Sequence, residues 1–518
     1  MSAFPDTYQP LRNHPPAATV VAGPIPLRPP PTVTVLAGLF LSLTISGCSV
    51  GPDYQPPRSD LAAFHSADAA LSRATGLPAP RLDSWWSGFN DPELSRVVGR
   101  ALDQNLDLAA ALARVEQARA AAHGAGARLL PSFDLNTQAG KQRQSLESPI
   151  GSIARHLPGY DRDQSLYDAG VAASWEIDLF GGLGRAAEAT TAEAEAAEAA
   201  HLGTRVSVAA DAADAYLRIR GDQTRLAINT DQVATDAKLL DLVRLRFARG
   251  LGSDREVAQA EALLSAARAS LQPLRIDLEG QLNRLDVLMG SQPGTHAAEL
   301  SVPANIPAAP GMANAEATEL LRRRPDIIAA ERRLAASNAR IGEAISGYYP
   351  KFSLSGLLGF ESTDAGHLFR ASTFQPQGLL GLRWRLFDFG RIDAEVAQAK
   401  GAEAEALARY RQTVLHAAED VENAFTALVQ LDAHAQELDS EVAALIRARD
   451  HSQTAYQGGL IPLTDVLDAD RQLLSAQDEL ARTRADVARS AVSAFRALGG
   501  GWSSNILASS ELPHAQNN

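Results

Sequence analysis

Two short stretches of this chain alternate strictly between apolar and polar positions. They are AASWEIDLFGG (172–182) and GLRWRLFDFGR (381–391). Successive side chains of a strand point to opposite faces, so each stretch places apolar side chains on one face and charged side chains on the other. We therefore predict two amphipathic strands. Their apolar face carries Trp175, Ile177, Leu382, Trp384 and Leu386.

Each of these strands follows another alternating stretch, and a polar loop lies between the two. The earlier stretches are PSFDLNTQAG (131–140) and PKFSLSGLLGF (350–360). A strand, a loop and a second strand predict a β-hairpin. The chain is therefore expected to contain two hairpins, which together supply four strands.

After each hairpin the pattern is helical over an unusual length. No proline occurs from about 185 to 248, and a second uninterrupted helix is expected from about 388 to 457. At ~1.5 Å per residue, about 65 residues extend on the order of 100 Å. In the second helix, apolar positions recur in alternating steps of three and four from Leu407 to Leu445, which is a coiled-coil pattern. Such helices need neighbours of similar length.

The two halves of the chain repeat one another. Trp175 and Trp384 are 384 − 175 = 209 positions apart, and Phe247 and Tyr456 are also 456 − 247 = 209 positions apart. We infer an internal duplication. The expected fold class is α+β, mostly α, with a unit of helix, β-hairpin and long helical hairpin present twice. The expected boundaries are 91–290 for the first repeat, 291–314 for a proline-rich linker, 315–498 for the second repeat and 499–518 for a C-terminal tail.

The single cysteine, Cys48, follows an apolar segment (32–47) that ends in ISGC. This segment is shorter than the ~20 residues that a membrane-spanning helix needs. It resembles the lipobox of bacterial lipoproteins, in which the cysteine becomes the lipidated first residue, and Ser49 then implies delivery to the outer membrane. We expect a signal peptide at 1–47 and a lipidated, extended segment at 48–90. The alternative is a buried structural cysteine after a short core helix.

Composition excludes several classes of function. The formal net charge of −13 argues against nucleic acid as a partner. The 11 histidines show no metal-ligand spacing, and the sequence lacks a serine-nucleophile or phosphate-loop motif. We therefore expect no enzymatic activity, no cofactor and no metal. Without a nucleotide site, the chain cannot drive transport by itself.

Four strands from one chain leave two open sheet edges, which lipid does not tolerate. Oligomerisation removes these edges. Several chains can then join their strands in a single closed barrel, with the apolar face outward. The alternative is a soluble sheet packed on helices.

Several motifs together resemble the TolC-like outer-membrane efflux factors, in particular their lipoprotein branch. They are CSVGPDYQPP, WWSGFNDPEL, ASWEIDLFG, RRRPDIIAAERRL, LTDVLDADRQLLSAQ and FRALGGGW, in family order over the mature chain. The resemblance implies a homotrimer, with a twelve-stranded transmembrane β-barrel in the outer membrane of a Gram-negative bacterium and an α-helical barrel in the periplasm. It implies a passive conduit that exports small molecules and drugs. The implied partners are outer-membrane lipid, a periplasmic adaptor protein and an inner-membrane pump of the resistance-nodulation-division type.

The motif LTDVLDADR places three charged residues on one helix face. Asp465, Asp468 and Arg471 are three residues apart. In a three-fold assembly each becomes a ring, and a ring of carboxylates attracts cations. The resemblance implies that the pore gate lies at Asp468 and Arg471. The alternative is an ordinary solvated helix face.

The turns RGLGS (249–253) and QGGLIP (457–462) reverse the chain farthest from the strands. The resemblance implies that these tips form the periplasmic mouth and meet the adaptor. The glycines must stop the helices in either case. The candidate docking residues are Arg249, Gly250, Leu251, Gly458, Gly459 and Leu460.

Two other functions remain open. A channel of the same fold can serve type I protein secretion or the export of another cargo. A pore-less, lipid-anchored periplasmic coiled-coil scaffold would need the long helices but would have no use for the two hairpins.

Overall fold

A computed structural model describes residues 49–57, 62–73, 79–312 and 323–503. The expected signal peptide (1–47) and the expected lipidation site, Cys48, lie outside the described residues.

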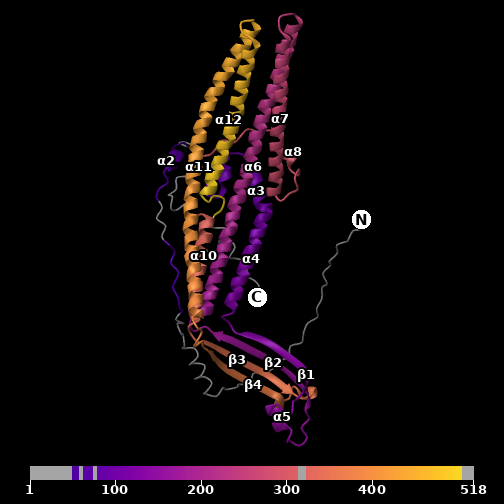
Figure 1. Cartoon of the computed structure of the whole chain (residues 1–518), viewed down its shortest axis with the longest axis vertical. Helices are drawn as coiled ribbons and strands as arrows, with labels where there is room; N and C mark the ends of the chain where they lie inside the picture. The colour runs from indigo at the N-terminus through magenta and orange to yellow at the C-terminus, as the bar shows by residue number, and fades with distance from the viewer. Residues whose placement is uncertain (1–48, 58–61, 74–78, 313–322, 504–518) are drawn as a thin grey trace, which may run out of the picture. The chain divides into compact units, whose positions relative to one another are not determined.

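The four predicted strands form one antiparallel sheet in the order β1-β2-β3-β4 (Figure 1). The strands are β1 (Ser132–Arg143), β2 (Asp163–Ile177), β3 (Lys351–Ser362) and β4 (Phe374–Arg383). Strand β2 pairs with β3, so the sheet joins the two halves of the chain. Strands β1 and β4 are each paired on one side only, which leaves both edges of the sheet open within the protomer.

The register of the strands gathers the predicted apolar positions on one face. Trp175 lies opposite Leu354, Ile177 lies opposite Phe352, and Phe352 lies opposite Leu382. The other face carries polar groups, and the Nζ of Lys351 lies 3.1 Å from Oε1 of Glu176. The sheet is therefore amphipathic across all four strands.

The second amphipathic strand is shorter than the sequence predicts. Strand β4 ends at Arg383, so Trp384 and Leu386 lie beyond it. The reason is the length of the partner strand, because β3 begins at Lys351 and the pair Lys351–Arg383 is the last of the ladder. The indole Nε1 of Trp384 instead donates a hydrogen bond to the carbonyl oxygen of Tyr348, at 2.9 Å.

The long helices repeat with the spacing that the sequence predicts. Helices α6 (Gly182–Ala248) and α11 (Arg391–Gln457) each have 67 residues, and 391 − 182 = 209. Helices α7 (Asp254–Leu288) and α12 (Leu463–Ala497) each have 35 residues, and 463 − 254 = 209. The equality of both lengths and both spacings extends the inferred duplication to whole helices.

Before the hairpins the spacing between equivalent elements is larger. Helices α4 (Leu106–Ala127) and α10 (Pro325–Ser346) both have 22 residues, and 325 − 106 = 219. Ten additional residues (219 − 209) therefore lie between the start of β1 and the start of α6. The loop of this first hairpin contains α5 (Pro149–Ala154), whereas the second contains two short 3-10 helices, η2 (Ala365–His367) and η3 (Ala371–Thr373).

Helix packing follows the heptad pattern. The pairs α6–α7 and α11–α12 form helical hairpins, α12 also packs on α6, and α10 packs on both α6 and α11. Every seam position of α11 named by the three-four pattern is buried or half-buried, from Leu407 to Leu445. Within the described ranges, no helix combines the length and the apolar character that a membrane span requires.

The remaining elements surround the main hydrophobic core. Its centre is Trp85, whose ring stacks on Phe495 with centroids 5.4 Å apart. Segment 48–90, expected to be extended, contains α2 (Ala67–Arg73) and the 3-10 helix η1 (Leu82–Phe89), because Trp85 and Phe89 turn into this core. Helix α3 (Pro92–Gln104) precedes α4, and α8 (Ala297–Leu300) lies in the expected linker.

Candidate functional site

The two predicted docking tips have the same backbone geometry. In the first, Gly250 has φ +72°, its N–H donates to the carbonyl of Phe247, and the N–H of Leu251 donates to the carbonyl of Arg246, both at 2.9 Å. In the second, Gly459 has φ +72°, and it and Leu460 make the equivalent bonds, again at 2.9 Å. This is a Schellman turn, in which glycine is favoured at the left-handed position.

Each tip presents one leucine to solvent. Leu251 is 67% exposed and Leu460 is 80% exposed. Arg246, next to the first tip, also contacts Tyr456, next to the second. Its Nη1 donates a hydrogen bond to the backbone carbonyl of Tyr456 at 3.1 Å, and its guanidinium carbon lies 4.6 Å from the centre of the Tyr456 ring. Each tip of the protomer therefore presents an exposed apolar knob, Leu251 or Leu460, and the contacts of Arg246 connect the two tips.

The three predicted gate residues lie on the exposed side of α12. Nη1 of Arg471 lies 3.4 Å from Oδ1 of Asp468, three residues earlier in the same helix. Asp465 is exposed and accepts a hydrogen bond only from the neighbouring Thr464, at 3.3 Å, among its described contacts. Within the protomer, the Asp–Arg pair thus lies along one helix rather than between helices.

Sequence reasoning missed a pair of buried carboxylates next to these residues. Asp236 of α6 is 1% exposed and Asp470 of α12 is 3% exposed. Gln232 Nε2 donates to Asp236 Oδ1 at 2.7 Å, and Nη1 of Arg449 lies 3.9 Å from Asp470 Oδ1. Oδ2 of Asp236 and Oδ1 of Asp470 are buried without a hydrogen-bond partner in the described part of the chain.

Burial controls the titration of this pair. It raises the pKa of Asp236 to about 6, against the lowering effect of the Gln232 hydrogen bond, and the charge of Asp470 raises it further. Burial also raises the pKa of Asp470, partly offset by the charge of Arg449. A signal was present in the sequence, because Asp470 interrupts an apolar stripe that contains Val466, Leu467 and Leu473.

Ion pairs fasten α6 to α12 farther along the hairpins. Arg225 of α6 donates to both carboxylate oxygens of Asp478, each at 2.9 Å. Arg489 Nε donates to Oδ1 of Asp214 at 2.6 Å. Bidentate arginine–carboxylate pairs fix geometry as well as energy. Polar pairs therefore interrupt the apolar contacts between these two helices.

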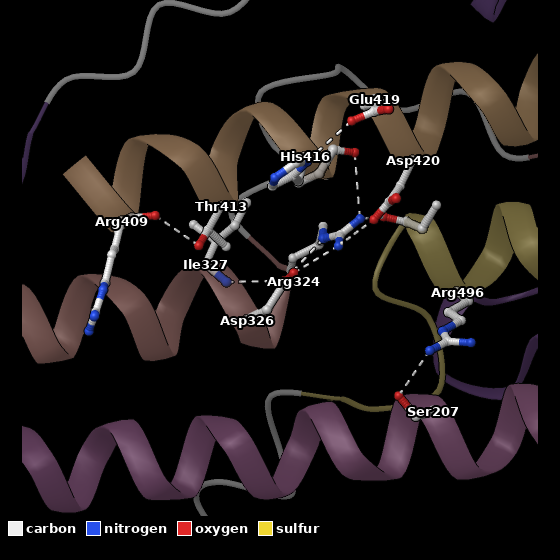
Figure 2. Close-up of polar contacts among 12 residues, drawn as sticks. Ser207, Arg324, Asp326, Ile327, Arg409, Thr413, His416, Glu419, Asp420 and Arg496 are labelled. Carbon is white, nitrogen blue, oxygen red and sulfur yellow. Dashed lines mark hydrogen bonds and ion pairs between the residues drawn. The ribbon is translucent and has the colours of Figure 1, made fainter. Parts of the chain in front are cut away.

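A further charged cluster joins α10, α11 and α12 (Figure 2). Arg324 precedes α10, and its Nη2 donates to Asp326 at 2.7 Å and to Asp420 of α11 at 2.9 Å. Its Nη1 donates to the carbonyl of Ala497 at the end of α12, at 3.0 Å. Arg324 is the third arginine of the RRRPDI motif. The hydrogen bonds of Arg324 tie α10, α11 and α12 together, and Arg324 also lines a cavity of about 540 Å³.

The described residues contain no group of three or more histidine, cysteine, aspartate or glutamate side chains placed to hold a metal ion. The features available for function are therefore the long helices with their exposed tips, the charged faces of these helices and the amphipathic sheet.

Comparison with known proteins identifies the family. The profile of the outer membrane efflux protein family matches residues 97–291 and 317–500. The chain belongs to this family. The efflux protein is similar to the pyoverdine export outer membrane protein OpmQ of Pseudomonas putida, with 33% identity over 470 residues, covering 90% of this chain and 97% of OpmQ. It is also similar to the toluene efflux pump outer membrane protein TtgI of Pseudomonas putida, with 29% identity over 489 residues, covering 90% and 98%.

The fold agrees with a solved structure of the same kind. The outer-membrane channel OprN matches with a TM-score of 0.80 and 32% identity, covering 88% of this chain and all of that chain. The predicted family, the mostly helical TolC-like channel fold and the outer-membrane location are confirmed. The efflux protein belongs to a family of channels rather than enzymes. A pore-less scaffold is accordingly the wrong class.

The buried acids predict a pH-dependent stability. Because the pKa of Asp236 is about 6 in the folded protein and 3.8 when unperturbed, the folded state binds more protons between these values. The free energy of unfolding therefore falls as pH rises from about 4 to about 6. Above about pH 6 the whole destabilising effect of the buried, ionised Asp236 is present. We expect Asp236→Asn to stabilise the protein on the order of 1 kcal/mol at neutral pH and much less at acidic pH.

The measurement is thermal unfolding of the detergent-solubilised protein, wild type and variant, at neutral pH and at about pH 4. Asp231→Asn, at an exposed position of the same helix, serves as the control and should change neither value. An equal shift at both pH values would contradict the assignment of the raised pKa to Asp236.

Proposed function

We propose that three copies of this efflux protein assemble side by side into a passive conduit across the outer membrane and into the periplasm. The observation that carries the proposal is the amphipathic sheet with two open edges. Unpaired backbone groups at a sheet edge are costly in lipid, and only closure removes them. When β1 of each copy pairs with β4 of the next, three sheets close into one barrel of twelve strands.

The exposed apolar face supports lipid contact. Leu354, Leu380 and Leu382 lie on this face and are exposed in the protomer. Trp175 Nε1 donates to the carbonyl of Leu129 at 2.8 Å, at the junction of strands and helices. Tryptophan favours such membrane interfaces because its ring is apolar and its N–H is polar. We propose that Trp175, Ile177 and Leu382 face lipid, with Trp384 and Leu386 at the rim.

The start of the mature chain supports lipidation at Cys48. The N–H of Val50 donates to the carbonyl of Phe180 at 3.2 Å, and Arg185 Nη2 lies 2.7 Å from Oδ1 of Asp53. Residues just after Cys48 are therefore held where β2 gives way to α6. If the sheet is in the membrane, this is the membrane surface, which is where an acyl anchor must enter.

Channels of this family are homotrimers that work with a periplasmic adaptor protein and an inner-membrane pump of the resistance-nodulation-division type. We assign the adaptor contact to the six tip residues 249–251 and 458–460. The cargo is of the small-molecule class, because relatives are named for export of pyoverdine and efflux of toluene. This favours small-molecule efflux over protein secretion.

The gate proposal rests on the exposed face of α12. In a three-fold assembly, Asp465, Asp468 and Arg471 each form a ring, and the charged rings narrow and close the resting pore. We expect wild-type protein to conduct in planar lipid bilayers. Asp468→Ala and Arg471→Ala should each raise the conductance, roughly two-fold or more, because each removes a side chain from the constriction.

Single-channel recording checks this, with Glu479→Ala on an exposed position of the same helix as the control. Unchanged conductance in both variants would remove the gate from these residues while leaving the conduit in place.

The docking proposal predicts that charge at either tip weakens adaptor binding. Leu251→Asp and Leu460→Asp each place a carboxylate on an exposed apolar knob, and each should weaken binding roughly ten-fold or more by burying an unpaired charge. The measurement is surface-immobilised binding of a purified efflux adaptor that supports export with this protein in cells.

Leu157→Asp is the matched control, because Leu157 is an exposed leucine in the loop of the first β-hairpin. It should leave adaptor affinity unchanged. If all three variants bind equally well, the tips are not the docking site.

A further inference from the structure

A cavity of about 500 Å³ lies where the sheet meets the helices. We call it the junction pocket. It is bordered by the first residue of β3, the last residue of β4, the residue after α4, the start of α6, and parts of α10 and α11. Its charged lining is Arg128, Arg340, Lys351, Arg383, Arg385, Glu343 and Glu395.

The charge of the junction pocket opposes that of the whole chain. Five cations and two carboxylates give a net charge of +3 (5 − 2) in the lining, whereas the chain carries −13. Such a reversal of sign in one place concentrates anions there. In a three-fold assembly the same lining occurs three times around the axis.

Part of this positive charge is not neutralised inside the protomer. Lys351 lies 3.1 Å from Glu176, Arg340 lies 3.0 Å from Glu193, and Arg385 is only loosely paired with Glu395, at 3.7 Å. Arg128 and Arg383 have no carboxylate within 4.0 Å among the described residues. Two guanidinium forks are thus available to an oxyanion, which they can bind bidentately.

The strand register decides which side of the sheet the pocket opens on. Lys351 and Arg383 are register partners, and Phe352 and Leu382 form the adjacent pair. Neighbouring positions of a strand face opposite sides, so the two cations lie on the face opposite Leu382 and Trp175. Resting on the proposed conduit, in which the apolar face meets lipid, the cations face the lumen.

We propose that the junction pocket is an anion-binding subsite of the conduit. It takes cargo that carries carboxylate or other anionic oxygen groups, at the level where the helical tube passes into the barrel. Such cargo first meets the acidic rings of the gate, which favour cations, and then a basic ring that favours its anionic groups. The two levels attract opposite charges, so zwitterionic and anionic small molecules have a binding step beyond the gate.

The test compares two double variants of the full protein in planar bilayers. Arg128→Gln with Arg383→Gln removes the two unpaired cations of the junction pocket. Arg411→Gln with Arg447→Gln is matched in charge, because both are exposed arginines of α11 outside the pocket lining. The readouts are the reversal potential in a KCl gradient and the block of current by citrate, a small polycarboxylate.

In the pocket variant we expect the ratio of chloride to potassium permeability to fall roughly two-fold. The citrate concentration that blocks half of the current should rise roughly five-fold. The matched variant should change neither value. Both recordings are repeated in phosphatidylcholine alone and with added phosphatidylglycerol, because a lipid headgroup offers the same anionic oxygens.

Unchanged citrate block and reversal potential in the pocket variant would overturn the subsite. It is also overturned if the two double variants differ in these readouts only when phosphatidylglycerol is present, since the pocket then holds lipid rather than cargo. Absence of current from wild-type protein would instead overturn the conduit, and the subsite with it. A conducting wild type therefore separates the two failures.

Discussion

The two open edges of the four-stranded sheet constrain the rest of the molecule. Every backbone N–H and C=O in lipid needs a partner, and β1 and β4 each leave one row without one. The apolar face that carries Trp175, Leu354 and Leu382 is also uncovered at Leu354 and Leu382 in the protomer, and burying it away from water is favourable. In the proposed conduit, closure with further copies pairs the two edges, and insertion of the closed barrel into lipid covers the apolar face. Each strand pair leads into a 67-residue helix, and shorter helices pack along each of these within the protomer, namely α4, α7, α10 and α12 on α6 and α10 and α12 on α11.

Equal length is what the internal duplication supplies. Helices α6 and α11 have the same length, as do α7 and α12, and both helical hairpins turn through the same Schellman geometry. Their apolar seams hold the hairpins together near the tips, and Arg225, Arg489 and Arg324 fasten the helices farther away. The departures from symmetry are local. At the position equivalent to the buried Asp470 the first repeat has an exposed acid, Glu261, and at the position equivalent to the proposed gate residue Asp468 it has Gln259.

Much of this architecture could be predicted from periodicity. Period-two alternation identified both hairpins, and three-four spacing identified the seam of α11, because both patterns reflect burial directly. The end of β4 was not predictable, since Trp384 continues the alternation and only the start of β3 at Lys351 shortens the ladder. The helices α2 and η1 were missed because their cause is long-range packing of Trp85 on Phe495. Asp236 and Asp470 were missed because an acid in an apolar stripe reads as a surface residue until its neighbours are known.

Electron microscopy of the detergent-extracted mature protein tests the central claim most directly. We expect a three-fold tube with a lumen, on the order of 100 Å long beyond a detergent belt, because a helix of 67 residues rises ~1.5 Å per residue. The belt should surround a closed barrel in which β1 of each copy pairs with β4 of the next. A monomer, or a solid rod without a lumen, would contradict the trimeric conduit, and with it the proposed gate and the proposed anion-binding subsite.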